Sequence, residues 1–292
     1  MTEVAVIGPG ALGCLFAARL ARSGVPTRLI DYDDDRAKLL RQQGLLVEEN
    51  EEILEAHPEI GIDFPVPPRL VLVLTKAHAT GRIALPPESP VLTLQNGLGN
   101  AETLAERCGE GRMLAGATTE AVTWLAPGRI RHAARGTTCF GSWTSCPADD
   151  ALALLQQAGF DVALTDNPRQ VIWEKAVVNA AINPLTALSN LENGALLDKP
   201  EIRNLLHLLA EEAAAVALAE GFPIGGSAAE RAEKACEASR HNISSMLQDI
   251  RKNKQTEIEA ISGEILRRAA KARVPAPQTA LVYHLVRALE SL

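Results

Sequence analysis

One apolar segment of the chain carries three polar side chains at helical spacing. Between Trp173 and Pro184, Lys175, Asn179 and Asn183 recur every four residues, which places them on one face of a helix. Their neighbours are mostly Ala, Val and Ile, so the helix should be largely buried, where a polar group needs a partner. An ammonium group and two amides on one helix face are suited to binding a ligand that carries a carboxylate and a neighbouring ketone oxygen. The alternative is a surface lysine with two capping amides.

The N-terminal region contains a glycine-rich loop between an apolar strand (4–7) and a helical stretch (14–20). The loop fits the pattern G-x-G-x-x-G and consists of Gly8, Pro9, Gly10, Ala11, Leu12 and Gly13. Glycines at this spacing permit a tight turn and close approach of the backbone to a pyrophosphate, whose charge the free N–H groups of the helix then bind. The loop therefore predicts a dinucleotide site.

An acid follows the second predicted strand and bears on the choice of dinucleotide. Asp31 lies 18 residues after Gly13, where a carboxylate accepts hydrogen bonds from the adenosine ribose of NAD and repels the extra phosphate of NADP. This residue alone slightly favours NAD(H). The alternatives are a solvated loop acid, or a phosphate bound by Arg28 or Arg36.

Further polar residues lie at strand ends and in the C-terminal half. Lys76 and Asn96 follow the predicted strands 70–74 and 91–94, where an open α/β sheet binds ligands; turn chemistry explains them equally well. Asn242 and Ser245 are three residues apart, so we expect them to be neighbours on a helix that lines a groove. Glu257 follows this polar stretch and is either part of the same groove or a surface acid.

The order of apolar segments predicts the fold. Residues 4–7, 27–30, 70–74 and 91–94 are continuous apolar runs alternating with helical or turn segments, which indicates a doubly wound, largely parallel Rossmann-type sheet. Segments 114–119, 129–132, 138–142 and 160–164 could extend this sheet. The chain then becomes rich in Ala, Leu and Glu, so we predict a dinucleotide-binding domain over 1–167 and a smaller all-α substrate domain over 168–292.

Composition excludes several classes of protein. With 29 basic and 36 acidic residues the net charge is −7, and no basic stripe suggests nucleic acid as a partner. Five cysteines without a C-x-x-C pair favour neither disulfides nor zinc, and we expect no metal. We find neither a secretory signal nor an apolar run of about 20 residues, which predicts a cytoplasmic protein with no membrane partner.

Taken together, these motifs resemble those of the ketopantoate reductases (2-dehydropantoate 2-reductases), enzymes of pantothenate and hence coenzyme A biosynthesis. The resemblance covers nearly the whole chain. Its segments are the glycine-rich loop, 75–77, 95–99, 173–187, 193–194, 242–250 and 256–258.

The resemblance implies reduction of ketopantoate to (R)-pantoate with a nicotinamide cofactor, NADP(H) being the usual one of the family. It implies that Lys175 is the general acid and that Glu257 touches both cofactor and substrate. The implied substrate-binding residues are Asn96, Lys175, Asn179, Asn183, Asn193, Asn242 and Ser245. The implied cofactor contacts are the six loop residues with Asp31, Lys76, Asn96, Val122 and Glu257.

Two positions depart from the family pattern. NADP-dependent members usually carry an arginine just past the second strand, where this chain has Asp31 and Tyr32, and Glu120 stands where the family often has histidine. The alternative functions are reduction of another 2-oxo acid on the same scaffold and dinucleotide sensing without turnover. The expected partner is a small 2-oxo acid, and a homodimer is one option that the sequence leaves open.

Overall fold

The computed structural model describes residues 3–291 and divides into two compact units. The first comprises Met1–Gln95 and Asn100–Val171, and the second comprises Asn96–Gly99 and Ile172–Leu292. This division follows contacts within the chain. The functional boundary after residue 167 stays a prediction.

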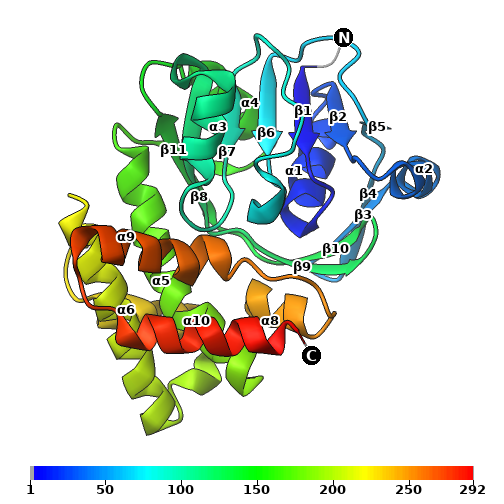
Figure 1. The fold of residues 1–292 in the computed structure, drawn as a ribbon. Coiled ribbons are helices and arrows are strands. Elements are labelled where there is room, and N and C mark those ends of the chain that lie inside the picture. Colours follow the sequence, from blue (N-terminus) through cyan, green and yellow to red (C-terminus); the bar gives the residue numbers. More distant parts are fainter. Residues whose placement is uncertain (1–2, 292) are drawn as a thin grey trace. The chain divides into compact units, whose positions relative to one another are not determined.

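An eight-stranded sheet forms the centre of the first unit (Figure 1). Its order is β12-β11-β8-β7-β6-β1-β2-β5, and every neighbouring pair is parallel except β8 and β11. The strands are β1 (Val4–Ile7), β2 (Thr27–Ile30), β5 (Glu59–Gly61), β6 (Leu70–Val73), β7 (Val91–Thr93), β8 (Met113–Thr118), β11 (Thr137–Ser142) and β12 (Asp161–Leu164). The predicted Rossmann-type α/β fold is confirmed, and the four apolar runs are β1, β2, β6 and β7.

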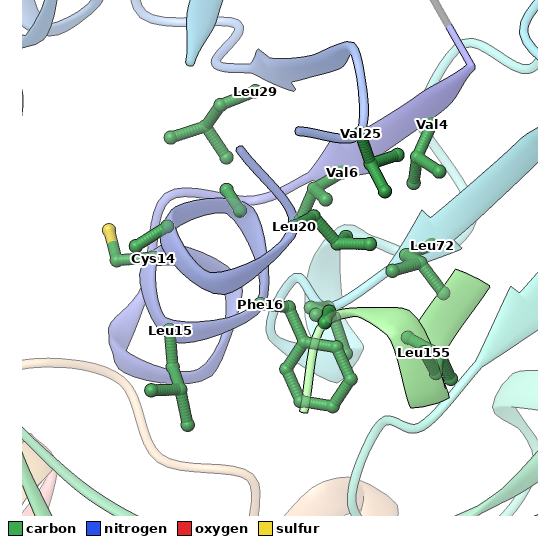
Figure 2. Packing of buried hydrophobic residues seen from close by; sticks show 14 of the residues in the cluster. Val4, Val6, Cys14, Leu15, Phe16, Leu20, Val25, Leu29, Leu72 and Leu155 are labelled. Atoms are coloured by element: carbon green, nitrogen blue, oxygen red, sulfur yellow. The ribbon is translucent and has the colours of Figure 1, made fainter. Parts of the chain in front are cut away.

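The helices of this unit bury the faces of the sheet. They are α1 (Ala11–Arg22), α2 (Asp34–Gln43), α3 (Asn100–Cys108) and α4 (Asp149–Gln157). Around α1, Phe16 and Leu20 gather with Leu72 of β6 and Leu155 of α4 (Figure 2), and the Phe16 ring stacks on Phe160 at 4.1 Å between centroids. Complete removal of these side chains from water fixes α1, and with it the glycine-rich loop, against the sheet.

A second sheet of four strands was not predicted. It has the order β4-β3-β10-β9, formed by β3 (Leu45–Glu49), β4 (Glu52–Ala56), β9 (Ala121–Ala126) and β10 (Arg129–Ala134). We expected residues 129–132 to extend the large sheet, which is wrong, because β10 pairs with β3 and β9 instead. This small sheet packs against α1, so α1 is covered on both sides.

The second unit is helical, as predicted. It contains α5 (Pro168–Ser189), α6 (Pro200–Ala219), α7 (Ala228–Ala238), α8 (Ser245–Ile250), α9 (Glu264–Ala272) and α10 (Pro277–Leu289), with a π-helix at Glu259–Gly263. Its core is mostly aliphatic and includes Val177, Leu209 and Ile265 from three different helices, each fully buried. The glycine- and proline-containing segments 193–194, 221–226 and 274–275 lie between these α-helices.

Candidate active site

The three glycines of the N-terminal loop serve different purposes. Gly8 has φ +106°, and a Cβ at this position would lie 2.8 Å from the backbone nitrogen of Thr75. A Cβ on Gly13 would lie 1.9 Å from the Gly8 carbonyl oxygen, whereas a Cβ on Gly10 would meet nothing within 4 Å. Packing within the chain therefore explains Gly8 and Gly13 but not Gly10. An exposed glycine at the start of α1 suits a ligand that approaches the backbone.

The N-terminus of α1 is suited to an anion. Gly10 is its N-cap and offers no side-chain hydrogen bond, and the first turn carries no acidic residue. The first N–H groups of such a helix keep their hydrogen-bonding capacity, and the helix dipole adds positive potential there. The loop thus fits the pyrophosphate of a dinucleotide.

Asp31 lies directly after β2, as predicted, but its carboxylate is covered. Arg36 donates to it from Nε at 2.5 Å and from Nη2 at 2.6 Å, and the backbone N–H of Asp33 donates at 3.0 Å. The side chain of Asp31 is 1% exposed and that of Arg36 is 44% exposed. Arg28, the other candidate phosphate ligand, instead bonds to Glu59 and Asp63. A guanidinium paired with a carboxylate therefore lies at the end of β2.

Lys76 follows β6 as predicted and is half-buried. The segment before it is held by Gln95, whose Nε2 donates to the Thr75 carbonyl at 2.9 Å and to Thr80 Oγ1 at 2.9 Å. Gln95 was not predicted as a site residue, although its position two residues after β7 was a usable signal. Val122 is a half-buried residue of β9, in the small sheet rather than among the large-sheet strands.

The predicted polar face lies on α5, which runs as one helix through Pro184. Lys175 and Asn179 are half-buried, and Asn183 is buried. Burial lowers the pKa of Lys175 from 10.5 to about 8, and the negative charge of Glu257 opposes part of that fall. An ammonium with a pKa near neutrality can release its proton readily, which distinguishes Lys175 from an ordinary surface lysine.

Glu257 is not a surface acid. Its side chain is buried, and its Oε2 accepts a hydrogen bond from Asn96 Nδ2 at 3.4 Å. Asn96 is brought there because residues 96–99 belong to the helical unit, where the Leu98 N–H donates to the Ala260 carbonyl at 2.8 Å. Asn96, Lys175 and Glu257 therefore come together from three distant parts of the sequence.

A second set of predicted residues surrounds the start of α8. Ser244 caps this helix by accepting from the Leu247 N–H, and its hydroxyl lies 2.7 Å from the Thr186 hydroxyl. Thr186 also donates to the Asn183 carbonyl at 2.9 Å. Ser245 is thereby fixed close to α5. Thr186 was not predicted, although it lies three residues after Asn183 and thus on a neighbouring part of the same helix face.

Asn193 and Asn242 are joined through the backbone, with the Asn193 N–H donating to the Asn242 carbonyl at 3.0 Å. Asn193 is buried, and its Nδ2 donates to Ser239 Oγ at 2.8 Å. Our expectation that Asn242 and Ser245 are neighbours on one helix is wrong. Ser244 caps α8, so that helix begins at Ser245 and Asn242 lies in the preceding turn.

The described residues reveal neither a metal centre nor a membrane span. Residues 3–291 contain no cluster of three His, Cys, Asp or Glu side chains that could hold a metal ion. Within the same range, no helix combines the length and hydrophobicity needed to cross a bilayer. The five cysteines are free thiols.

Family models match both halves of the chain. The model described as "Ketopantoate reductase PanE/ApbA" covers residues 4–145, and the corresponding C-terminal model covers residues 167–290. The chain belongs to the ketopantoate reductase family. Among the curated relatives of this chain, the 2-dehydropantoate 2-reductase of Halobacterium salinarum is 33% identical to it over 98% of both chains. That of Salmonella typhi is 33% identical over 99% of this chain and 95% of its own.

Solved structures share the fold over almost the whole length. A ketopantoate reductase from Ralstonia eutropha JMP134 has a TM-score of 0.89 at 31% identity, covering 99% of this chain and 98% of its own. A ternary structure of D-mandelate dehydrogenase with NADH and anilino(oxo)acetate has a TM-score of 0.91 at 23% identity, with the same coverage. At that identity the second likeness concerns the fold alone.

Proposed function

We propose that this chain reduces 2-dehydropantoate to (R)-pantoate by hydride transfer from a nicotinamide dinucleotide, in pantothenate and hence coenzyme A biosynthesis in the cytoplasm. The observation that carries the proposal is Lys175 on the polar face of α5, whose pKa burial lowers to about 8 although the charge of Glu257 opposes that fall. Family membership and the names of the relatives support the same reaction.

Lys175 is the general acid of the proposed reaction. A nicotinamide dinucleotide, when bound, would supply the hydride for the carbonyl carbon, and negative charge would then develop on the carbonyl oxygen. The Lys175 ammonium stabilises that charge and transfers a proton to the oxygen, which yields the hydroxyl of the product. Proton transfer is favoured because burial has already made the ammonium a stronger acid.

Glu257 and the amides position the reactants. Glu257 is assigned to contacts with both cofactor and substrate, and its negative charge raises the protonated fraction of Lys175 at neutral pH. Amide and hydroxyl groups that donate hydrogen bonds can hold the substrate carboxylate without adding a competing charge. The residues that we assign to substrate binding, besides Lys175, are Asn96, Asn179, Asn183, Asn193, Asn242 and Ser245.

The cofactor is assigned to the first unit. The glycine-rich loop from Gly8 to Gly13 and the N-terminus of α1 would hold the pyrophosphate, and Asp31 with Arg36 would meet the adenosine ribose. The further cofactor contacts that we propose are Lys76, Asn96, Val122 and Glu257, with Val122 on the nicotinamide side. The Asp31 carboxylate favours NADH, because it would accept hydrogen bonds from the ribose hydroxyls. The partly exposed guanidinium of Arg36 favours NADPH, because it could bind the extra phosphate. Both reduced cofactors are therefore assayed.

Oxidation of NADH and of NADPH, followed with ketopantoate and separately with pyruvate and 2-oxoisovalerate, tests the proposal. We expect ketopantoate to be the preferred substrate. A higher kcat/KM for either simpler acid would assign the chain to another 2-oxo acid. Binding of cofactor without oxidation by any of the three acids would leave only a sensing role, and the enzymatic function would be rejected.

A further inference from the structure

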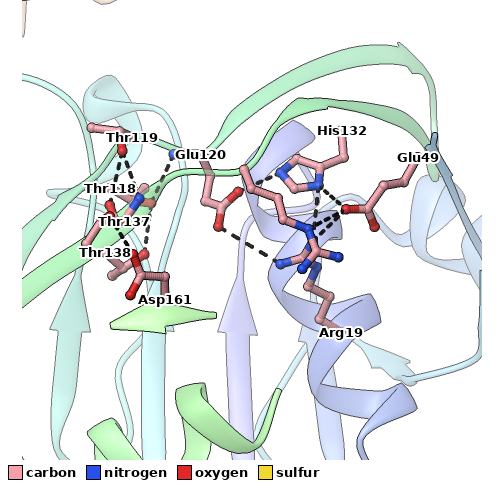
Figure 3. A network of polar contacts seen from close by, with 10 residues as sticks. Arg19, Glu49, Thr118, Thr119, Glu120, His132, Thr137, Thr138 and Asp161 are labelled. Carbon is pink, nitrogen blue, oxygen red and sulfur yellow. Dashed lines mark hydrogen bonds and ion pairs between the residues drawn. The ribbon is translucent and has the colours of Figure 1, made fainter. Parts of the chain in front are cut away.

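A buried group of charges joins the small sheet to helix α1 (Figure 3). We call it the Arg19 network, and its members are Arg19 of α1, Glu49 of β3, Glu120 from the segment between β8 and β9, and His132 of β10. Arg135, just after β10, contacts Glu49 from the surface, with 67% of its side chain exposed. The side chains of Glu120 and His132 are each 1% exposed. Charges so far from water are retained at a cost, and they need partners on every side.

The imidazole of His132 lies between the two carboxylates of the network. Its Nε2–H donates to Glu120 Oε2 at 2.5 Å, because a carboxylate only accepts. Its Nδ1 lies 3.0 Å from Glu49 Oε1 and 3.1 Å from Arg19 Nη2, which itself donates to Glu49 Oε1 at 3.0 Å. Arg135 Nε donates to the same Glu49 oxygen at 3.0 Å.

Glu120 lies where the backbone leaves the large sheet for the small one. Just before it, the Thr118 and Thr138 hydroxyls are 2.9 Å apart and the Thr119 N–H donates to the Thr137 carbonyl at 3.0 Å. Just after it β9 begins. The crossing is therefore held on the large-sheet side by threonines and on the small-sheet side by the pairing of Glu120 with His132.

The network acts on the strand that carries Val122. His132 lies opposite Val122 in the antiparallel register of β9 and β10. Val122 packs against the core cluster that contains α1, as do Ala11 and Leu12 at the start of that helix. Through Arg19 the network also holds α1 itself. It thus connects the helix that follows the glycine-rich loop with the strand assigned to the nicotinamide.

We infer that Glu120 and His132 are positioning residues for hydride transfer. With Arg19 and Glu49 they hold Val122 of β9 in a fixed position relative to helix α1. This rests on the proposed function, which places the nicotinamide against Val122. The cofactor's adenosine and pyrophosphate groups are assigned to the opposite end of the site. Disturbing the network should therefore misplace the nicotinamide while leaving most of the binding contacts intact.

The test compares two substitutions at one position. Glu120→Leu removes the acceptor and leaves the Nε2–H of His132 buried without a partner, whereas Glu120→Gln keeps an acceptor and removes only the charge. The matched control is Glu48→Gln. Glu48 is the neighbouring residue on β3, and its oxygens accept from Arg129 and Arg131, whose side chains are 49% and 59% exposed. It therefore makes similar ion pairs outside the Arg19 network.

Three measurements separate positioning from stability. They are the dissociation constant of the cofactor, kcat with its primary isotope effect from 4-deuterated NAD(P)H, and the fluorescence of bound NAD(P)H. We expect Glu120→Leu to lower kcat by about tenfold or more, since an error of about 1 Å in reactant placement can cost about a hundredfold. Its isotope effect should rise and the emission should change, while the dissociation constant stays within about threefold. Glu120→Gln should be intermediate and Glu48→Gln unchanged.

Other outcomes would overturn the inference. An unchanged isotope effect and emission in Glu120→Leu, with activity falling only as the folded fraction falls, would show that the network merely stabilises the fold. A proportional rise in the cofactor dissociation constant would assign it to binding. If the wild type fails to oxidise cofactor with any 2-oxo acid, the proposed function fails, and the fluorescence comparison still decides the role of Glu120.

Discussion

The pH dependence of the reduction follows from the state of Lys175. The residue must carry its proton to act as an acid, and its pKa is about 8. About nine-tenths of the enzyme is therefore competent at pH 7 and about one-tenth at pH 9, and kcat/KM should fall about tenfold per unit above that. An ordinary lysine, with its pKa of 10.5, would give a flat profile over the same range.

Glu257→Gln tests the cause of the falling limb of the pH profile, which is the decrease in kcat/KM above about pH 8. The Glu257 charge raises the pKa of Lys175 against the larger effect of burial, so its removal should move the falling limb to lower pH. The assay is kcat/KM for ketopantoate between pH 6 and pH 10 at saturating reduced cofactor.

The matched control is Glu259→Gln. Glu259 lies two residues away and accepts from the Tyr283 hydroxyl at 2.5 Å, so its loss should leave the limb in place. In Lys175→Arg the limb should disappear, because arginine does not titrate in this range, and turnover should fall by about a hundredfold or more. A limb near pH 10.5 in the wild type, or an unmoved limb in Glu257→Gln, would refute the assignment of Lys175 as the acid.

Three further predictions concern stability and the cofactor. The folded-state pKa of Lys175 lies below its unfolded value, so charged Lys175 destabilises the fold below pH 8. This cost disappears as the pH rises from about 8 to about 10.5. At about 1.36 kcal/mol per pKa unit, Lys175→Met should raise the free energy of unfolding at pH 7 by up to about 3 kcal/mol while abolishing turnover. Gly10→Ala should weaken cofactor binding with little change in melting temperature, whereas Gly13→Ala should lower the melting temperature itself, because only the Cβ of residue 13 collides with the chain. Arg36→Gln should weaken NADPH more than NADH, and Asp31→Asn should weaken NADH more than NADPH.

Each of these three has a direct check. Urea unfolding at pH 7 and at pH 10.5 tests Lys175→Met, and equal gains at both pH values would contradict the electrostatic origin. Calorimetric titration with thermal melts separates the two glycine variants, which should not behave alike. For Arg36→Gln and Asp31→Asn, the dissociation constants of NADH and NADPH are compared. Parallel changes in the two variants would show that neither residue discriminates between the two cofactors.

Much of the large sheet could be predicted because its strands bury both faces. The segments Val4–Ile7 and Leu70–Val73 are wholly apolar and fully covered, so pattern alone locates them. The small sheet could not be found in this way. Strand β4 is mostly exposed, and β10 alternates charged and buried residues around Ile130 and His132. Such strands are stabilised by contacts with α1 and with each other, which a local pattern does not reveal.

The candidate site shows the same division between local and long-range information. Helical spacing places Lys175, Asn179 and Asn183 on one helix, because that relation is local. The burial of Glu257 depends on segments more than 80 residues away in the sequence, so no local pattern separates it from a surface acid. Pairing of Asp31 with Arg36 is local, but which of them is exposed depends on side-chain packing.

The placement of Asn96–Gly99 within the helical unit limits how the protein can be divided. The backbone passes between the two units three times, after residues 95, 99 and 171. A fragment that begins at residue 172 would lack Leu98, a buried member of the helical core, and the backbone hydrogen bond to Ala260. The helical half is therefore not an interchangeable module. Any recombination of this scaffold, by evolution or by design, must transfer residues 96–99 together with the helical half that begins at residue 172.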